Sequence, residues 1–282
     1  MRHVFTVRVG PIGFRVGSEW RAPIEQLNAL YSDYPPLEGV PDFTVRLEPV
    51  RPWRRWVRPA VSIAGDYAIP DAAPLPLAQG LLAAEMAMNL QMALGQRKFL
   101  LLHAAAAERD GRAIIMTGES GAGKSTLVAL LQRRGWRLMA DEFVLVDPST
   151  GLVVPFPRPI SMKNAAIAVA AAALPGARFG PLLSGTPKGD IRHLVPNHAA
   201  LAAMDEAAEP ALLLFPRFGL PAEQRPVGAG EAFVRLTQAS TNYVGLGEAG
   251  CTALTRLGNG VTRMAIDYPE ADTAAALIEA MW

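Results

Sequence analysis

The chain has 282 residues, of which 50% are hydrophobic and 19% charged, and its formal net charge at pH 7 is +1. This length suits one large domain or two modest ones. The near-neutral charge gives no electrostatic reason to expect a nucleic-acid partner. Because Cys251 is the single cysteine, a disulfide framework within the chain is excluded.

We expect neither a signal peptide nor a membrane span. The N-terminal sequence MRHVFTVRVG has no continuous apolar segment. The longest apolar runs are Phe99–Ala107 and Ala165–Leu174, far short of the ~20 residues that cross a bilayer. These features predict a cytoplasmic protein without membrane insertion.

The first part of the chain predicts a small α+β region. Val4–Val9 and Phe14–Val16 flank the turn Gly10-Pro11 and are typical of a short hairpin. A helix is expected over Ala22–Tyr31 and a strand over Phe43–Leu47.

A segment of interleaved arginines and tryptophans, RPWRRWVRP, follows that strand. Interleaved cations and aromatic rings are able to stack on bases or clamp phosphates. The alternative is a surface strand whose arginine side chains cover its tryptophans. We favour the surface strand because the chain has no wider basic field. The residues concerned are Arg51, Arg54, Arg55, Arg58, Trp53 and Trp56.

The Pro- and Ala-rich segment Pro70–Pro76 is typical of a linker. It divides the chain into a predicted N-terminal α+β region, residues 1–76, and a second domain, residues 77–282. The second domain opens with an apolar helix expected over Leu77–Gln96.

Two apolar strands, Leu100–Ala107 and Arg112–Thr117, flank Asp110-Gly111. This pair favours a two-residue hairpin turn because both positions tolerate positive φ. If the strands pair directly across the turn, His103 lies opposite residue 118, the first glycine of the next motif. A histidine alone on an apolar strand is usually a core residue. In this register it would instead contact a transferring phosphate or tune a neighbouring carboxylate.

The segment TGESGAGKST matches the P-loop pattern G-x-x-x-x-G-K-[ST], with a strand before it and a helix after it. The loop amides and the helix N-terminus suit phosphate groups. Lys124 is expected to reach the β- and γ-phosphates of a nucleotide and Ser125 to ligate Mg²⁺. The predicted nucleotide-binding residues are Gly118, Glu119, Ser120, Gly121, Ala122, Gly123, Lys124, Ser125 and Thr126.

A helix is expected over Lys124–Arg134, and the next strand, Trp136–Ala140, ends at Asp141 and Glu142. Ligands of α/β sheets lie at the carboxyl ends of strands, so we expect Asp141 near the phosphates. Two roles stay open for its carboxylate: it binds the metal, as a Walker-B acid does, or it takes the proton of an acceptor hydroxyl. Glu142 takes the role that Asp141 does not, or it is a solvated surface carboxylate. The alternative for Asp141 is a helix or turn cap.

Cations downstream suit the charge that develops in phosphoryl transfer. RPISMKN carries Arg158 and Lys163 in a predicted loop, TPKGD carries Lys188 in another, and FPRF holds Arg217 at a strand end. Each is either a phosphate or substrate contact or an ordinary surface cation. The remaining predicted elements are a hairpin of Phe143–Val146 and Leu152–Val154, helices over Met162–Leu174, Ala249–Arg256 and Ala271–Ala280, and strands over Ala211–Phe215 and Val261–Tyr268.

These residues resemble a known family, most specifically over residues 100–164. LLHAAAAERDGRAIIMTGESGAGKSTLVALLQRRGWRLMADE resembles the core of bacterial HPr kinase/phosphorylase. With RPISMKN and TPKG, the whole chain resembles the HPr kinase-related kinase A group. The resemblance implies a P-loop kinase core akin to HPr kinase and phosphoenolpyruvate carboxykinase, with His103 and Asp141 in the catalytic centre and Asp141 as general base. The E-x-R-G-x-G element of HPr kinases has no match in this sequence.

The sequence therefore predicts an α/β kinase that uses ATP and Mg²⁺ to phosphorylate a serine-type hydroxyl of a protein or peptide. The alternatives are a small-molecule kinase on the same core and a nucleotide-gated binding protein with slow hydrolysis. No nucleic-acid partner is expected, and self-association into a homo-oligomer stays open. The predicted catalytic residues are His103, Lys124 and Asp141, and the predicted metal site comprises Ser125, Asp141 and Glu142.

Overall fold

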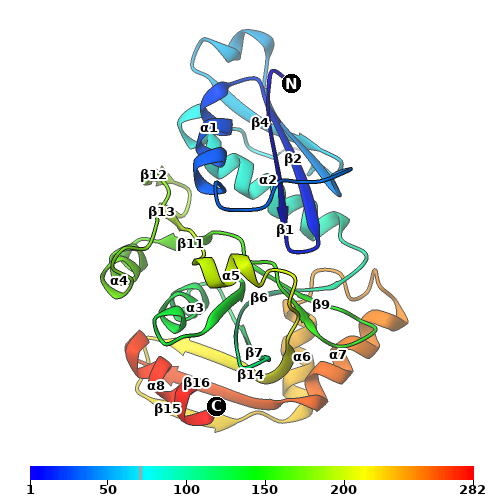
Figure 1. Ribbon diagram of the computed structural model, residues 1–282, viewed down its shortest axis with the longest axis vertical. Helices are drawn as coiled ribbons and strands as arrows, with labels where there is room; N and C mark the ends of the chain where they lie inside the picture. Colours follow the sequence, from blue (N-terminus) through cyan, green and yellow to red (C-terminus); the bar gives the residue numbers. More distant parts are fainter. Residues whose placement is uncertain (70–71) are drawn as a thin grey trace.

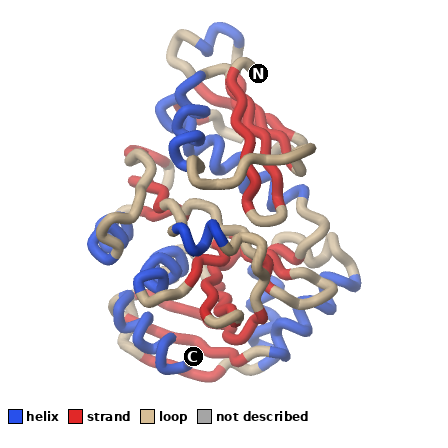
Figure 2. The backbone as a smooth tube through the Cα atoms, in the orientation of Figure 1, coloured by secondary structure: helices blue, strands red, loops and turns tan. Residues whose placement is uncertain are grey.

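The computed structural model describes residues 1–69 and 72–282, which form a mixed α/β protein with three β-sheets (Figures 1 and 2). Two sheets combine parallel and antiparallel pairs, and the third is antiparallel. Within the described residues, no helix is both long and apolar enough to cross a bilayer. Pro70 and Asp71, at the start of the predicted linker, lie outside the described residues.

A five-stranded sheet and the helix α1 (Arg21–Leu30) form the N-terminal part of the molecule. The 3₁₀ turn η2 (Leu77–Gln79) leads into α2 (Gly80–Gly95), which packs on β3, β4 and α1. The predicted domain boundary at residue 76 stays a prediction. Helix α2 follows that boundary in the sequence but packs on the N-terminal sheet. The strand order is β1 (His3–Val9), β2 (Ile12–Ser18), β3 (Phe43–Pro49), β4 (Ala60–Gly65) and β5 (Leu75–Pro76).

An eight-stranded central sheet fills the other half of the molecule (Figure 1). β6 pairs antiparallel with β7 along one edge and with β8 and β9 along the other, and β7, β14 and β16 are parallel neighbours. The strands are β6 (Leu100–Arg109), β7 (Arg112–Thr117), β8 (Arg137–Ala140), β9 (Phe143–Val146), β10 (Val153–Val154), β14 (Glu209–Phe218), β15 (Glu223–Pro226) and β16 (Thr262–Tyr268).

Helices cover both faces of the central sheet, so its strands are continuous apolar runs instead of alternating ones. Ala113 and Ile115 of β7 belong to the core shared with α6 and α7, whereas Ile114 and Met116 belong to the core shared with α3 and α8. The helices are α3 (Lys124–Arg133), α6 (Ala229–Ala239), α7 (Glu248–Gly260) and α8 (Ala271–Met281).

The third sheet lies between the N-terminal part and α3 (Figure 1). Its central strand is β13 (Gly189–Leu194), paired antiparallel with β11 (Ile160–Lys163) and β12 (Leu183–Thr186). Helix α4 (Ala165–Ala173) packs on α3 and β11, and the short helix α5 (His198–Ala202) packs on β8.

The predicted hairpin over residues 100–117 is confirmed together with its register. Asp110 and Gly111 both have positive φ, at 55° and 77°. Ala104 pairs with Thr117 directly across the turn. His103 therefore lies beside the start of the P-loop.

The predicted surface strand at RPWRRWVRP is wrong. The segment contains a 3₁₀ turn, η1 (Pro52–Arg55), because the fixed φ of Pro52 suits the first position of a helical turn. Arg54 does lie over the Trp53 ring and Arg55 over the Trp56 ring, but the two tryptophans stay 49% and 73% exposed.

The predicted helix over Met162–Leu174 starts three residues later. Met162 and Lys163 belong to β11, where they pair with β13, so Lys163 lies in a strand and not in the predicted loop. Asn164 then turns the chain with a φ of 50°, and α4 begins at Ala165.

A buried charge cluster ties the N-terminal part to the segment that leads into β11. The Arg158 guanidinium, 4% exposed, pairs with the Glu85 carboxylate of α2 and donates to the side chain of Asn89. It also lies 3.3 Å from the Tyr31 hydroxyl, which donates to Glu85 at 2.8 Å. Both charges are satisfied only while the two parts stay together.

We predict that Arg158→Met lowers the free energy of unfolding by about 3–5 kcal/mol, because it leaves the Glu85 carboxylate buried without a partner. The measurement is urea denaturation followed by circular dichroism. Arg21→Met is the matched control, since its ion pair with Glu25 is exposed and worth at most about 1 kcal/mol. Equal losses in the two variants would contradict the structural role of the cluster.

Candidate functional site

The segment between β7 and α3 has the strand–loop–helix form that a P-loop requires. Gly121 and Gly123 both have a φ of 90°, which side chains rarely adopt. A Cβ on Gly123 would also lie 2.0 Å from the Tyr268 hydroxyl, which donates to the Ala122 carbonyl at 2.8 Å. The glycine at this position is therefore required by both backbone angle and space.

Lys124 folds back over the loop. Its ammonium donates to the carbonyls of Gly118 at 2.7 Å and Glu119 at 3.0 Å. Partial burial lowers the pKa of Lys124, and the nearby carboxylates of Asp141 and Glu142 oppose that shift. The other predicted loop residues lie in the same turn, with Glu119 and Ser120 exposed and Thr126 in the first turn of α3.

Asp141 reaches the P-loop from β8. β7 and β8 run in the same direction, since both are antiparallel to β6, and their carboxyl ends meet at one end of the sheet. The Ser125 hydroxyl donates to the Asp141 carboxylate at 3.0 Å. Burial, and secondarily the charge of Glu142, raises the pKa of Asp141 to about 6.

Glu142 forms the corner between β8 and β9 with a φ of 74°. Its carboxylate lies 3.8 Å from Nδ1 of His103, a half-exposed side chain on β6. Burial lowers the pKa of His103, whereas Glu142 acts in the opposite direction. The structure thus brings His103, Asp141 and Glu142 to the end of the sheet from which the P-loop starts.

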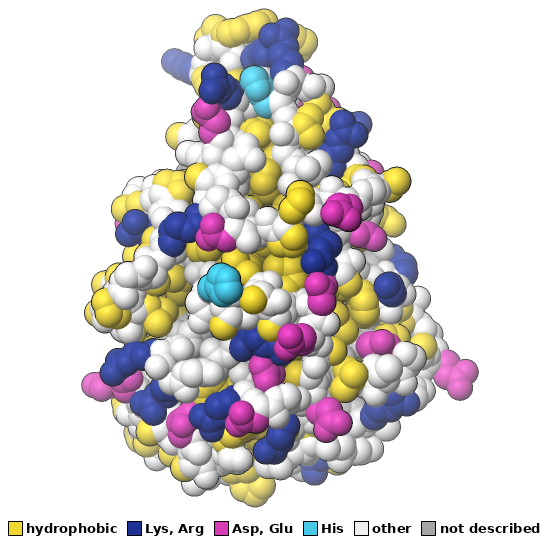
Figure 3. All heavy atoms as spheres, viewed as in Figure 1, with side chains coloured by type: hydrophobic (Ala, Val, Ile, Leu, Met, Phe, Trp, Pro, Cys, Tyr) yellow, Lys and Arg dark blue, Asp and Glu magenta, His cyan; other side chains and the backbone are white. Residues whose placement is uncertain are grey.

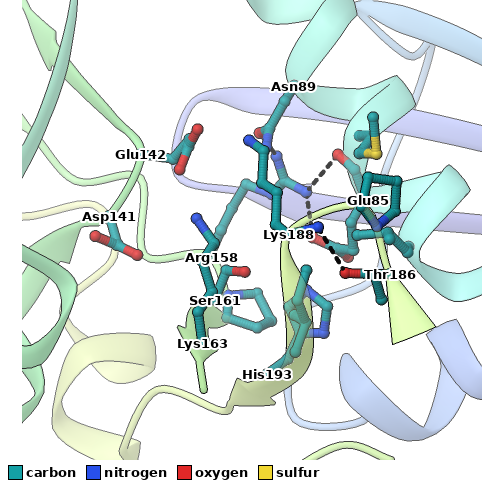
Figure 4. A pocket seen from close by; sticks show the side chains of 15 residues that line it. Glu85, Asn89, Asp141, Glu142, Arg158, Ser161, Lys163, Thr186, Lys188 and His193 are labelled. Carbon is teal, nitrogen blue, oxygen red and sulfur yellow. Dashed lines mark hydrogen bonds and ion pairs between the residues drawn. The ribbon is translucent and has the colours of Figure 1, made fainter. Parts of the chain in front are cut away.

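A pocket of about 130 Å³ opens beside these carboxylates (Figure 4). Asp141 and Glu142 lie on one side of it, and Glu85 of α2 and Thr186 of β12 lie on the other. The N-terminal part therefore supplies one wall of the pocket, and the central sheet supplies the opposite one. Its lining comprises Leu82, Glu85, Met86, Asn89, Asp141, Glu142, Arg158, Pro159, Ser161, Lys163, Thr186, Pro187, Lys188, Ile191 and His193.

The third sheet forms the floor of this pocket. Ser161 pairs with His193 and Lys163 with Ile191, so these four side chains project from one face of the β11–β13 ladder. Lys188 joins them from the turn between β12 and β13. Within the residues the structure describes, neither Lys163 nor Lys188 forms an ion pair.

The two predicted arginine contacts are already engaged. Arg158 forms one wall of the pocket but is held by Glu85 and Asn89. Arg217 lies at the end of β14 and pairs with Asp267 of β16, with 2.7 Å between Nε and the carboxylate. Of the four predicted cations, Lys163 and Lys188 are therefore the two that have no ion-pair partner in the described part of the chain.

Three residues of the site are absent from the sequence-based prediction. Tyr268 contacts the P-loop because β16 runs parallel to β14, and its place at the end of a predicted strand was the available signal. His193 lines the pocket with an unpartnered Nδ1, and burial lowers its pKa. Asn89 reaches the pocket from α2. No sequence pattern marks His193 or Asn89, since both depend on the packing of separate elements.

Among the described residues, no group of three or more His, Cys, Asp or Glu side chains could hold a metal ion alone. Ser125, Asp141 and Glu142 nevertheless supply oxygen atoms beside the P-loop. This donor set fits Mg²⁺, which commonly takes one or two carboxylates and completes its ligands with substrate phosphates and water.

Neither a protein-family model nor a curated protein matches this chain. Among solved structures, the HPr(Ser) kinase/phosphatase from Coxiella burnetii is similar to it with a TM-score of 0.31 and 18% identity. The match covers 64% of this chain and 92% of that chain. So distant a likeness carries no functional inference, and the function must be judged from the geometry of the site.

We predict that the contribution of Asp141 to the free energy of unfolding falls as the pH rises from about 4 to about 6. The folded protein holds the Asp141 proton more tightly than the unfolded chain does, so ionisation in this range favours unfolding. Urea denaturation of wild type and Asp141→Asn at several pH values isolates this contribution, expected to be about 3 kcal/mol at most.

Glu142→Gln is the matched variant for this prediction. Removing the neighbouring charge should bring the pKa of Asp141 closer to its ordinary value and shrink the pH-dependent difference. A difference between wild type and Asp141→Asn that is constant with pH would mean that Asp141 is not perturbed.

Proposed function

We propose that this protein transfers the terminal phosphoryl group of ATP, bound with Mg²⁺, to a serine-type hydroxyl of a protein or peptide. The observation that carries the proposal is the position of Asp141. Its buried carboxylate accepts a hydrogen bond from the P-loop serine and lines a pocket on its other side, and its pKa is raised to about 6. A group with this pKa is ionised at neutral pH and still basic enough to accept a proton.

The P-loop holds the nucleotide phosphates in this proposal. When phosphates occupy the loop, the Lys124 ammonium exchanges its carbonyl partners, Gly118 and Glu119, for β- and γ-phosphate oxygens. With Asp141 as the base, Ser125 and Glu142 would hold the Mg²⁺, which would neutralise charge on the same phosphates.

The acceptor hydroxyl enters the pocket on the far side of Asp141. Asp141 takes the hydroxyl proton while the acceptor oxygen bonds to the γ-phosphorus, and the bond between that phosphorus and the β,γ-bridging oxygen breaks to release ADP. Lys163 and Lys188 line the pocket and form no ion pair in the described part of the chain, so their positive charge is available to the transferred phosphoryl group. His103, held beside Glu142, tunes the carboxylate pair.

A small molecule is the second candidate acceptor. A pocket of about 130 Å³ takes one side chain or one small compound, so its size does not separate a peptidyl serine from a free hydroxyl compound. We place the peptidyl serine first only because the sequence over residues 100–164 resembles that of HPr kinase-related proteins.

The test supplies ATP labelled at the γ-phosphate, first with cell extract and then with a metabolite mixture. A labelled polypeptide that depends on the protein supports the proposal. A labelled small product identifies a small-molecule kinase, and release of free phosphate alone would show that the protein is an ATPase.

We predict that Lys124→Ala abolishes the thermal stabilisation that Mg·ATP gives the wild type, about 5 °C at a hundredfold excess over Kd. Differential scanning fluorimetry measures the shift. Lys98→Ala is the control, because Lys98 is an exposed lysine outside the site. A shift that survives in Lys124→Ala would exclude the P-loop as the nucleotide site.

We predict that Asp141→Asn keeps the Mg·ATP stabilisation but lowers the transfer rate by about 10²–10⁴-fold, since the amide cannot accept the proton. In the wild type, kcat/KM should fall as the pH drops below about 6, where the carboxylate becomes protonated. Asp272→Asn, an exposed change in the first turn of α8, serves as the control. An unchanged rate in Asp141→Asn would remove Asp141 from the role of base.

A further inference from the structure

The loop between β3 and β4 forms the end of the molecule farthest from the central sheet (Figures 1 and 2). It carries four large hydrophobic side chains in solvent: Val50 is 45% exposed, Trp53 49%, Trp56 73% and Val57 57%. Figure 3 shows hydrophobic side chains capping this convex end, with arginine or lysine side chains beside them. We call residues 50–58 the tip.

The tip is held in place although its rings are exposed. Within it, backbone amides of Arg54, Trp56 and Val57 donate to carbonyls of Arg51 and Trp53. At its base, Arg55 pairs with Glu19 and donates to the Glu19 carbonyl at 2.9 Å.

Trp20 completes this base, since its indole nitrogen donates to the Arg55 carbonyl at 2.9 Å. The exposure of the two tip tryptophans is therefore fixed by the fold, and exposed apolar groups on an ordered support mark an interaction surface.

The tip also carries an excess of positive charge. Arg51, Arg54 and Arg58 have no carboxylate partner within the described residues, whereas Arg55 is neutralised by Glu19. The Arg54 guanidinium lies over the Trp53 ring and donates to the Arg58 carbonyl. Arginine side chains therefore surround the exposed tryptophan and valine side chains of the tip.

We propose that the tip binds the surface of an anionic membrane. Tryptophan rings favour the boundary between headgroups and hydrocarbon, and valines gain from the hydrocarbon side. Arginines near an anionic bilayer strengthen binding by about fivefold each. The apolar and the electrostatic attraction together meet the requirement that stable peripheral binding combines two signals.

Single-stranded nucleic acid is the less suitable partner for the same residues. Nucleic acid is usually followed by a basic groove with stacking rings along it. The tip is convex, and Val50 and Val57 offer nothing for a base to stack on. The P-loop and its pocket lie away from the tip, toward the central sheet, so membrane binding through the tip leaves them open. This proposal is therefore independent of the proposed function.

The test is cosedimentation of the full chain with large unilamellar vesicles of phosphatidylcholine containing 30% phosphatidylglycerol, in 0.1 M salt. We expect binding to these vesicles, at least tenfold weaker binding to pure phosphatidylcholine, and weaker binding as salt rises. Trp53→Ser/Trp56→Ser and Arg51→Gln/Arg58→Gln should each reduce binding at least tenfold. All variants should keep the wild-type melting temperature, because these side chains lie at the surface.

Two controls use exposed residues elsewhere. Val244→Ser removes a side chain that is 74% exposed, and Arg133→Gln/Arg134→Gln removes two exposed charges near the end of α3. Both should bind vesicles like the wild type. Absence of vesicle binding, undiminished binding by the tip variants, or tip-dependent binding of a fluorescent oligo-dT without vesicle binding would overturn the proposal.

Discussion

The register of β6 with the strands on both its edges is the constraint on which the site depends. On one edge Ala104 pairs with Thr117, so the P-loop begins at that level. On the other edge β8 and β9 are joined by Asp141 and Glu142, and His103 pairs with the first residue of β9. The P-loop and the carboxylates of Asp141 and Glu142 therefore lie on opposite sides of β6 at the same level. A one-residue slip of either edge would turn the side chains of that strand to the opposite face of the sheet.

The pocket depends on a second, weaker constraint, the seating of the N-terminal part. Burial of the Asp141 carboxylate raises its pKa, and α2 together with the third sheet closes the space in front of it. The Arg158–Glu85 pair crosses the same boundary. Buried ion pairs contribute little net stability but make a wrong arrangement costly, because each charge then loses its partner. In this protein the pair is positioned to fix the shape of the pocket beside Asp141.

Sequence patterns predicted the part of the site that is formed by residues close together in the sequence. Asp110-Gly111 gave the hairpin and its register, and the P-loop motif gave the strand, loop and helix around Lys124. Patterns failed where distant elements decide the outcome. Lys163 pairs with β13, a strand that no periodicity indicated, and Arg158 is taken by Glu85 of α2. The sequence shows that these cations exist, but only the packing of separate elements determines which of them remain available.

The central claim is that the terminal phosphate lies between the P-loop and a buried base that faces an acceptor pocket. A crystal structure with Mg²⁺ and a non-hydrolysable ATP analogue tests it most directly. We expect the terminal phosphate between the side chains of Lys124 and Asp141. The face of its phosphorus opposite the β,γ-bridging oxygen should be directed toward the pocket lined by Lys163 and Lys188. A nucleotide bound elsewhere, or a terminal phosphate directed away from Asp141 and the pocket, would contradict the account.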